Sequence, residues 1–263
     1  YDDADDRLIL EDAWMEHRIG IFEDVLNPAD DRPDKVLFPP DFETVEDAID
    51  DIRDDDLIVP TDVETGARFD DAFAHLRHKH GSYWRWVRPV FDGPTRSAAN
   101  ARIEFRPLAA QPTVRDAVSL EAVFAGLLSA LVRMEHPVRS MDWETARENF
   151  YAASRDGLRA DLTWITSDGA ETDSIDRLYG ELFEAAREGL ERHGLSTEQA
   201  RRYVRPLRER VDRRMTPARW KHRRVADAVD ENVPLAEAIW GTQSAYVDRQ
   251  AETLLEGTFV DWL

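Results

Sequence analysis

The sequence contains no cysteine, only three lysines among its 34 basic residues, and no apolar run as long as a membrane span. The absence of cysteine excludes disulfides, thiolate nucleophiles and thiolate metal sites. Without a span-length apolar run, the chain is not expected to cross a membrane. It also lacks a basic cluster with interleaved aromatic residues, and its net charge is −20. That charge repels a phosphate backbone, so we expect no nucleic-acid partner.

The acidic balance does not indicate disorder, because 42% of the residues are hydrophobic and can form a real core. A surface rich in Asp and Glu and almost free of lysine predicts a cytoplasmic protein from a high-salt organism, where salt screens self-repulsion. A surface specialised for a particular partner is the alternative. The chain begins at Tyr1 rather than at a methionine, so we expect that its N-terminal part is missing.

Residues 101–106 alternate apolar and charged side chains, which predicts a half-buried strand. Ile103 and Phe105 are expected to face a core. The opposite face would then carry an acid between two guanidiniums: Arg102, Glu104 and Arg106. Arginine binds phosphate oxygens in a bidentate fork, and Glu is an oxygen ligand for magnesium. A solvated, ion-paired strand face is the alternative, and it is the commoner outcome for such a pattern.

An aromatic segment precedes this strand, with Tyr83, Trp84 and Trp86 close together. Such residues usually pack in a core. The functional alternative is that they wall a nucleotide or substrate pocket, which Arg85 and Arg88 favour because an arginine in an apolar setting needs an anionic partner. Gly93-Pro94 marks a turn, so the two strands are predicted to be antiparallel neighbours joined by about ten residues.

Three histidines lie just before the aromatic segment, as His75, His78 and His80. Imidazole is a ligand for Zn²⁺ and other transition metals. Arg77 and Lys79 stand between the histidines and would repel a metal ion. We therefore interpret this segment as a solvated helix end.

Helical periodicity dominates the rest of the chain. Residues 44–53 and 69–78 are predicted helices, and Thr113 caps a long apolar helix in which Ala125 and Gly126 permit close approach by a neighbour. Further helices are predicted from Asp142 to about Gly157, then over 173–193, 197–213, 217–229 and 233–255. The fold class is therefore α+β, one domain with an antiparallel sheet backed by helices: a sheet-containing part (1–136) and a helical part (137–263).

Three segments resemble glutamate–cysteine ligase family 2, the carboxylate–amine ligases, in the same order along the chain. They are Tyr83-Trp84-Arg85-Trp86-Val87-Arg88-Pro89, the strand from Ala101 to Leu108 followed by Gln111-Pro112-Thr113, and Glu144 to Leu158. The resemblance spans roughly residues 12–260 and is strongest over 80–160. It implies a fold similar to the catalytic domains of glutamine synthetase.

The resemblance implies an ATP-dependent reaction in which a carboxylate, the γ-carboxylate of glutamate or a similar one, becomes an acyl phosphate that an amine such as cysteine then attacks. ATP and magnesium (Mg²⁺) are the implied cofactors. The resemblance implies small-molecule partners and is compatible with a homo-oligomer. The implied catalytic residues are Arg106, Arg88 and Arg155; Arg85, Trp86, Asn149 and Tyr151 would bind the cofactor, and Glu104 would bind the metal.

The helix that carries Asn149 allows a simpler interpretation. Arg147, Tyr151, Arg155 and Arg159 recur every four residues and can form a surface stripe bridged to nearby glutamates. The early acidic motif of the family, of the type Glu-Glu-x-Phe, is also not found before Glu104. The chain is therefore either a ligase without its N-terminal part or a non-catalytic relative that serves as a small-molecule-binding or structural module.

Overall fold

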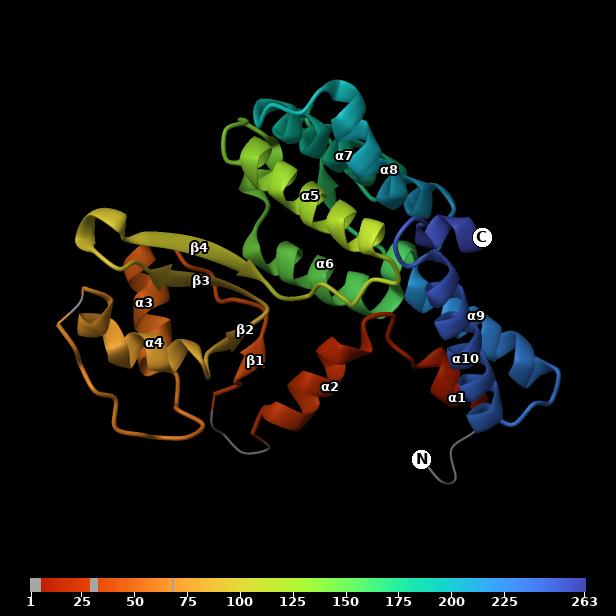
Figure 1. The fold of residues 1–263 in the computed structure, drawn as a ribbon, viewed down its shortest axis with the longest axis horizontal. Coiled ribbons are helices and arrows are strands. Elements are labelled where there is room, and N and C mark those ends of the chain that lie inside the picture. Colours follow the sequence, from red (N-terminus) through yellow and green to blue (C-terminus); the bar gives the residue numbers. More distant parts are fainter. Residues whose placement is uncertain (1–5, 29–32, 68) are drawn as a thin grey trace. The chain divides into compact units, whose positions relative to one another are not determined.

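The computed structural model describes residues 6–28, 33–67 and 69–263, and it has the predicted mixed α+β composition. The chain divides into two compact units (Figure 1). We call Arg18–Ala109 the sheet unit, and Ala110–Leu263 with the first residues up to His17 the helical unit. The division at 109/110 precedes the predicted one at 136/137, because the long helix that starts at Val114 packs against later helices. A single catalytic domain stays a prediction.

The sheet unit contains two strand pairs and short helices. Its elements are α2 (His17–Leu26), β1 (Val36–Leu37), α3 (Val45–Asp54), α4 (Ala74–His80), β2 (Trp84–Arg85), β3 (Val87–Asp92) and β4 (Asn100–Phe105). Strands β1 and β2 pair in parallel, whereas β3 and β4 form the predicted antiparallel pair. The connection over 93–99 is shorter than expected, and it begins at Gly93 (φ 141°), where a Cβ would lie 2.6 Å from the Ala99 Cα.

Helix α3 shows why the predicted helix at 44–53 forms. The Thr44 hydroxyl accepts from the Asp47 amide at 3.1 Å and the Asp47 carboxylate accepts from the Thr44 amide at 2.8 Å, so that two of the orphan amides are satisfied. Ala48 and Ile52 then lie buried on one face. They belong to a small core with Ile19, Val36, Tyr83, Trp86 and Val90.

One prediction for the β3–β4 hairpin was wrong, the direction in which Ile103 faces. Ile103 does not face a core: it is 50% exposed, because the register places it opposite Pro89, on the other side of the hairpin from the buried Val90. The segment 57–59 forms no strand and is largely exposed. On the other face of the hairpin, Val90 of β3 is buried while Arg102 opposite it on β4 is exposed.

The helical unit contains the predicted series of helices. They are α1 (Asp6–Glu11), α5 (Val114–Leu131), α6 (Trp143–Asp156), α7 (Ile175–Arg192), α8 (Thr197–Asp212), α9 (Pro217–Asp230) and α10 (Leu235–Thr253), with the strands β5 (Trp164–Ile165) and β6 (Glu171–Thr172) paired antiparallel. Thr113 caps α5 as predicted and accepts from the Asp116 amide at 3.1 Å. In the described part of the chain, no helix combines the length and apolarity needed to cross a membrane.

Helices α5 and α7 touch through their backbones. A Cβ built on Gly126 would lie 2.3 Å from the carbonyl oxygen of Ala186, and one on Gly189 would lie 1.9 Å from that of Gly126. This confirms the prediction that Gly126 allows close approach. Around the crossing, Val123, Phe183 and residues of α8 form the main apolar core.

A buried ion pair joins the start of α5 to α8. Asp116 is fully buried and lies 2.7 Å from Arg210 Nη2, and its other oxygen accepts from the Phe259 amide at 2.8 Å. Arg210 also donates to the Gln111 side chain at 2.8 Å. The Gln111-Pro112-Thr113 segment thus holds the helical unit together.

Candidate active site

The candidate active site lies on the β3–β4 hairpin, where the register places Arg88 directly opposite Glu104. The two side chains form an ion pair. Three charged residues were predicted on this strand face. Arg102 is exposed and lies 3.5 Å from Asp92, and Glu104 pairs with Arg88. Arg106 is half-buried just after the end of β4. The three residues thus have three different environments.

The side chain of Arg88 is bound by the protein itself. Its Nε donates to Glu104, and one terminal nitrogen donates to the backbone carbonyls of His80 and Tyr83. The side chain is 12% exposed. These contacts tie β3 to the end of α4, and they leave little of the guanidinium fork for a substrate.

Arg106 is different, because its half-buried side chain forms no hydrogen bond or ion pair with another described residue. Its amide donates to the Trp86 carbonyl at 2.9 Å, which fixes the backbone. Burial lowers the pKa of Arg106, and the nearby Arg88 and Arg18 lower it further, whereas Glu104 raises it. Arginine nevertheless stays charged at any physiological pH. Glu104 is paired with Arg88, so the charge of Arg106 is a positive charge that a bound anion can balance.

Arg18 of α2 fixes the backbone around Arg106. It donates to the carbonyl oxygens of Arg106 at 2.9 Å and Leu108 at 3.1 Å, and it lies 6.0 Å from the centre of the Trp86 ring. Trp86 is buried, and its indole donates to Glu23 at 2.8 Å. Trp86 is therefore a packed residue of the sheet unit, and its role in binding a cofactor stays a prediction.

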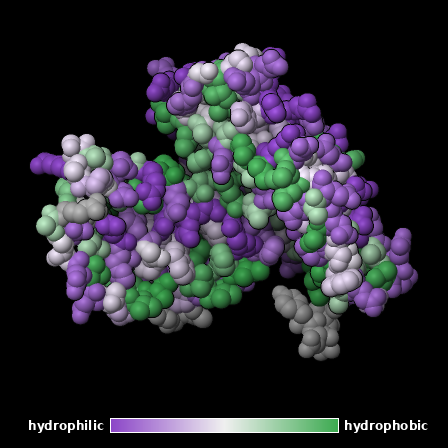
Figure 2. Space-filling view, in the orientation of Figure 1, coloured by the Kyte–Doolittle hydropathy of each residue, from purple (hydrophilic) through white to green (hydrophobic). Residues whose placement is uncertain are grey.

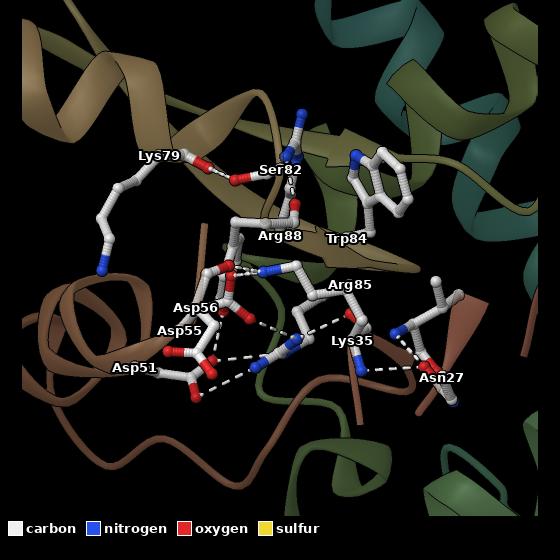
Figure 3. A network of polar contacts seen from close by, with 12 residues as sticks. Asn27, Lys35, Asp51, Asp55, Asp56, Lys79, Ser82, Trp84, Arg85 and Arg88 are labelled. Atoms are coloured by element: carbon white, nitrogen blue, oxygen red, sulfur yellow. Dashed lines mark hydrogen bonds and ion pairs between the residues drawn. The ribbon is translucent and has the colours of Figure 1, made fainter. Parts of the chain in front are cut away.

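Arg85, a predicted cofactor ligand, is buried in a network of polar contacts with carboxylates (Figure 3). Its guanidinium contacts Asp51 at 3.2 Å and Asp55 at 3.4 Å, and it donates to the Lys35 carbonyl at 2.9 Å. Tyr83 also donates to Asp51, at 2.6 Å, and burial followed by this hydrogen bond raises the pKa of Tyr83. The anionic partner that Arg85 needs is thus supplied by α3, and we leave Arg85 out of the site.

His80 is buried at the end of α4, and neither ring nitrogen has a hydrogen-bond partner among the residues that the structure describes. Its ring lies 6.4 Å from Tyr83 and 6.2 Å from Phe91. Burial lowers its pKa, as do Arg88 and Arg102, while Glu104 raises it. The expected solvated helix end therefore does not include His80, which stands neutral beside the Arg88–Glu104 pair.

The remaining predicted residues belong to the helical unit. Asn149 holds the segment after α6 by exchanging hydrogen bonds with the Thr163 backbone at 2.7 and 2.8 Å. Tyr151 lies 5.2 Å beneath the Arg147 guanidinium. Arg155 is exposed and 3.9 Å from Asp12. These three residues have structural or surface contacts within their own unit, and their roles in a site stay predictions.

The described residues do not fit a magnesium site. No group of three or more His, Asp or Glu that could hold a metal ion occurs among them. Glu104 alone supplies too few oxygens, and its carboxylate is engaged by Arg88. An apolar cavity of about 410 Å³ beside the hairpin, lined by Phe91, Ala101 and side chains of α3 and α4, contains none of the predicted site residues.

Two residues of this cluster were not identified as site residues from the sequence. His80 had a visible signal, the histidine pattern at the end of α4. Arg18 had none, because its link to Arg106 spans 88 positions of the chain. Local patterns cannot reveal contacts of that range.

The comparisons with known proteins gave one match. The sequence model of glutamate–cysteine ligase family 2 matches residues 11–245. Comparison with curated proteins and with solved structures found no match. The matched range covers most of the chain and includes the hairpin and helices α5 to α9 in full.

Proposed function

The chain belongs to glutamate–cysteine ligase family 2, and from this premise we propose that it is an ATP-dependent ligase that joins glutamate, or a similar carboxylate, to an amine such as cysteine. Membership of the family supports a carboxylate–amine ligase activity in general. The observation that carries the finer proposal is Arg106, a half-buried guanidinium with no side-chain partner among the described residues.

In the proposed reaction, a carboxylate oxygen attacks the γ-phosphorus of ATP, and the bond between that phosphorus and the ADP oxygen breaks. The amine nitrogen then attacks the carbonyl carbon of the acyl phosphate. Phosphate leaves as the amide forms, and the nitrogen loses a proton to solvent. Arg106 would bind the transferring phosphoryl group through its fork, since such transfers depend mainly on positioning and neutralisation of charge. No step is assigned to a metal ion, because the described residues do not fit one.

The test is ATP-dependent phosphate release in high salt, with glutamate and a panel of amines as substrates. The Arg106→Ala substitution is expected to lower the rate by about 100-fold, as for removal of one preorganised charge partner. The Arg106→Lys substitution keeps the charge but not the fork, so its rate should lie between those of Arg106→Ala and the unsubstituted chain.

The matched control is Arg102→Ala, four positions earlier, on β4, with a side chain that is 59% exposed. Its rate should equal that of the unsubstituted chain. Thermal unfolding of each variant shows whether the hairpin remains folded. Undiminished phosphate release by folded Arg106→Ala protein would remove this assignment.

A non-catalytic relative is the second candidate, and the ion pair between Glu104 and Arg88 favours it. A carboxylate engaged in this way is a poor metal ligand, and the described residues form no metal-binding group. On this alternative the chain releases no phosphate with any amine, yet still binds glutamate or ATP in calorimetry. The same assay therefore separates the two candidates.

A further inference from the structure

A groove of about 1000 Å³ lies in the helical unit between α5, α7 and α8. Its lining contains six arginines and three glutamates, a formal excess of three positive charges in a chain whose net charge is −20. We call it the arginine groove, after Arg115, Arg187, Arg201, Arg202, Arg205 and Arg208. A local charge opposite to that of the whole molecule indicates a site for an anion.

Three of these arginines are engaged within the protein. Arg187 pairs with Glu184 and Glu191, Arg205 lies 3.0 Å from Glu209, and the Arg208 guanidinium lies 5.5 Å from the centre of the Phe183 ring. They form a fixed wall along α7 and α8.

The other three arginines have donors available. Arg115 and Arg202 are exposed and form no hydrogen bond or ion pair with any residue that the structure describes. Arg201 is near enough to Glu184 and Glu191 to help lower the pKa of both carboxyls, but it forms no hydrogen bond to a described residue. These three guanidiniums come from the start of α5 and from one turn of α8.

Apolar side chains lie between the cations. Phe183 is buried at the base, while Val118 is 40% exposed and Tyr203 is 37% exposed. In the space-filling view, apolar residues appear over α5 with hydrophilic residues over α8 beside them (Figure 2). An exposed tyrosine beside arginines can stack on a nucleotide base, which makes the groove more than a charged surface.

We propose that the arginine groove binds a small polyphosphate, either free or as part of a nucleotide. A triphosphate carries enough negative charge to offset the positive excess of the lining, part of which Glu191 already balances through Arg187. Arginine forks match phosphate oxygens in bidentate geometry. The volume is that of a ligand-sized cavity. The groove lies in the helical unit and Arg106 in the sheet unit, so this proposal does not depend on the proposed function.

The test is calorimetric titration of the full chain with sodium tripolyphosphate at fixed ionic strength. The Arg115→Ala/Arg202→Ala double variant should bind at least tenfold more weakly, since each lost guanidinium removes charge-assisted hydrogen bonds. Arg249→Ala is the matched control, because Arg249 is also exposed, its side chain has no partner among the described residues, and it lies outside the groove. Arg106→Ala should keep the tripolyphosphate binding of the groove.

Equal affinity of the double variant and the unsubstituted chain would overturn the proposal, and so would equal weakening by Arg249→Ala. Absence of any binding would also overturn it. Titration with ATP distinguishes a nucleotide from free polyphosphate as the ligand. ATP that binds more tightly than tripolyphosphate, with the difference lost in Tyr203→Leu, supports a nucleotide. Equal affinity for the two compounds supports recognition of the phosphates alone. Citrate, a carboxylate of similar charge, should bind more weakly.

Discussion

Arginines of similar sequence context differ here in what their guanidiniums bind. The Arg85 fork is used by two carboxylates of α3, and that of Arg88 by Glu104 and two carbonyls. The Arg106 side chain has no such contacts to described residues. A half-buried cation without a side-chain partner has lost part of its hydration, and a bound anion can compensate that loss. This argument makes Arg106 the centre of the proposed site.

His80 gives a prediction in terms of pH. Its pKa in the folded chain lies below the ordinary value of 6.5, so the unfolded chain binds more protons between the two values. The contribution of His80 to the free energy of unfolding should therefore be fully present above about pH 6.5 and fall on acidification, by up to about 1.4 kcal/mol per pH unit. His80→Phe keeps an aromatic ring and should remove this part of the slope.

Denaturant unfolding between pH 5 and 8 measures both proteins. His75→Gln, which alters an exposed histidine of the same helix, is the control and should leave the slope unchanged. Identical slopes for His80→Phe and the unsubstituted chain would contradict the prediction.

At the scale of single residues, the sequence placed Glu104 and Arg106 on one predicted strand. It also indicated that Arg85 needs an anionic partner. It could not show that Asp51 and Asp55 meet this need, because they lie 34 and 30 positions away. The partners of a charged side chain are set by tertiary packing, and no local pattern encodes them.

Secondary-structure elements were better predicted than side-chain partners. The caps at Thr113 and Asp142 and the helices from α7 to α10 follow local rules and formed as expected. The prediction that Ile103 faces a core was wrong, because alternation in the sequence shows that a strand has two different faces but not which face meets the core. The parallel pairing of β1 with β2 also joins segments too far apart for a pattern to predict.

The crossing of α5 and α7 gives a prediction at the scale of elements. In Gly126→Ala the new methyl group would meet the Ala186 backbone, which cannot rotate away. The helices must separate, so the free energy of unfolding should fall by roughly 1–3 kcal/mol. Chemical denaturation measures the change.

Gly180→Ala is the matched control on the opposing helix. A Cβ at Gly180 would meet nothing within 4 Å, so alanine should raise stability by roughly 0.5–1 kcal/mol through higher helix propensity. The two substitutions add the same methyl group and should act with opposite sign. A neutral or stabilising Gly126→Ala would mean that the helices do not touch as described.

The whole molecule is governed by its charge of −20. Buried ion pairs such as Asp116–Arg210 are screened little by salt, whereas the exposed carboxylates repel one another at long range. Arginine rather than lysine supplies nearly all of the compensating charge, and many arginines contact carboxylates, carbonyls or aromatic rings. Mobile ions must therefore offset the remaining repulsion.

The last prediction follows from this balance. Raising KCl from about 0.1 to 1 M shortens the Debye length from about 10 to 3 Å, so the free energy of unfolding should rise. Asp248 and Glu252 are exposed four positions apart on α10, where like charges destabilise a helix. The Asp248→Asn/Glu252→Gln variant should be more stable at low salt and depend less on salt. Gln243→Glu, an exposed position of the same helix, should have the opposite effect. Equal salt dependence of all three proteins would show that local packing, rather than summed repulsion, sets the response.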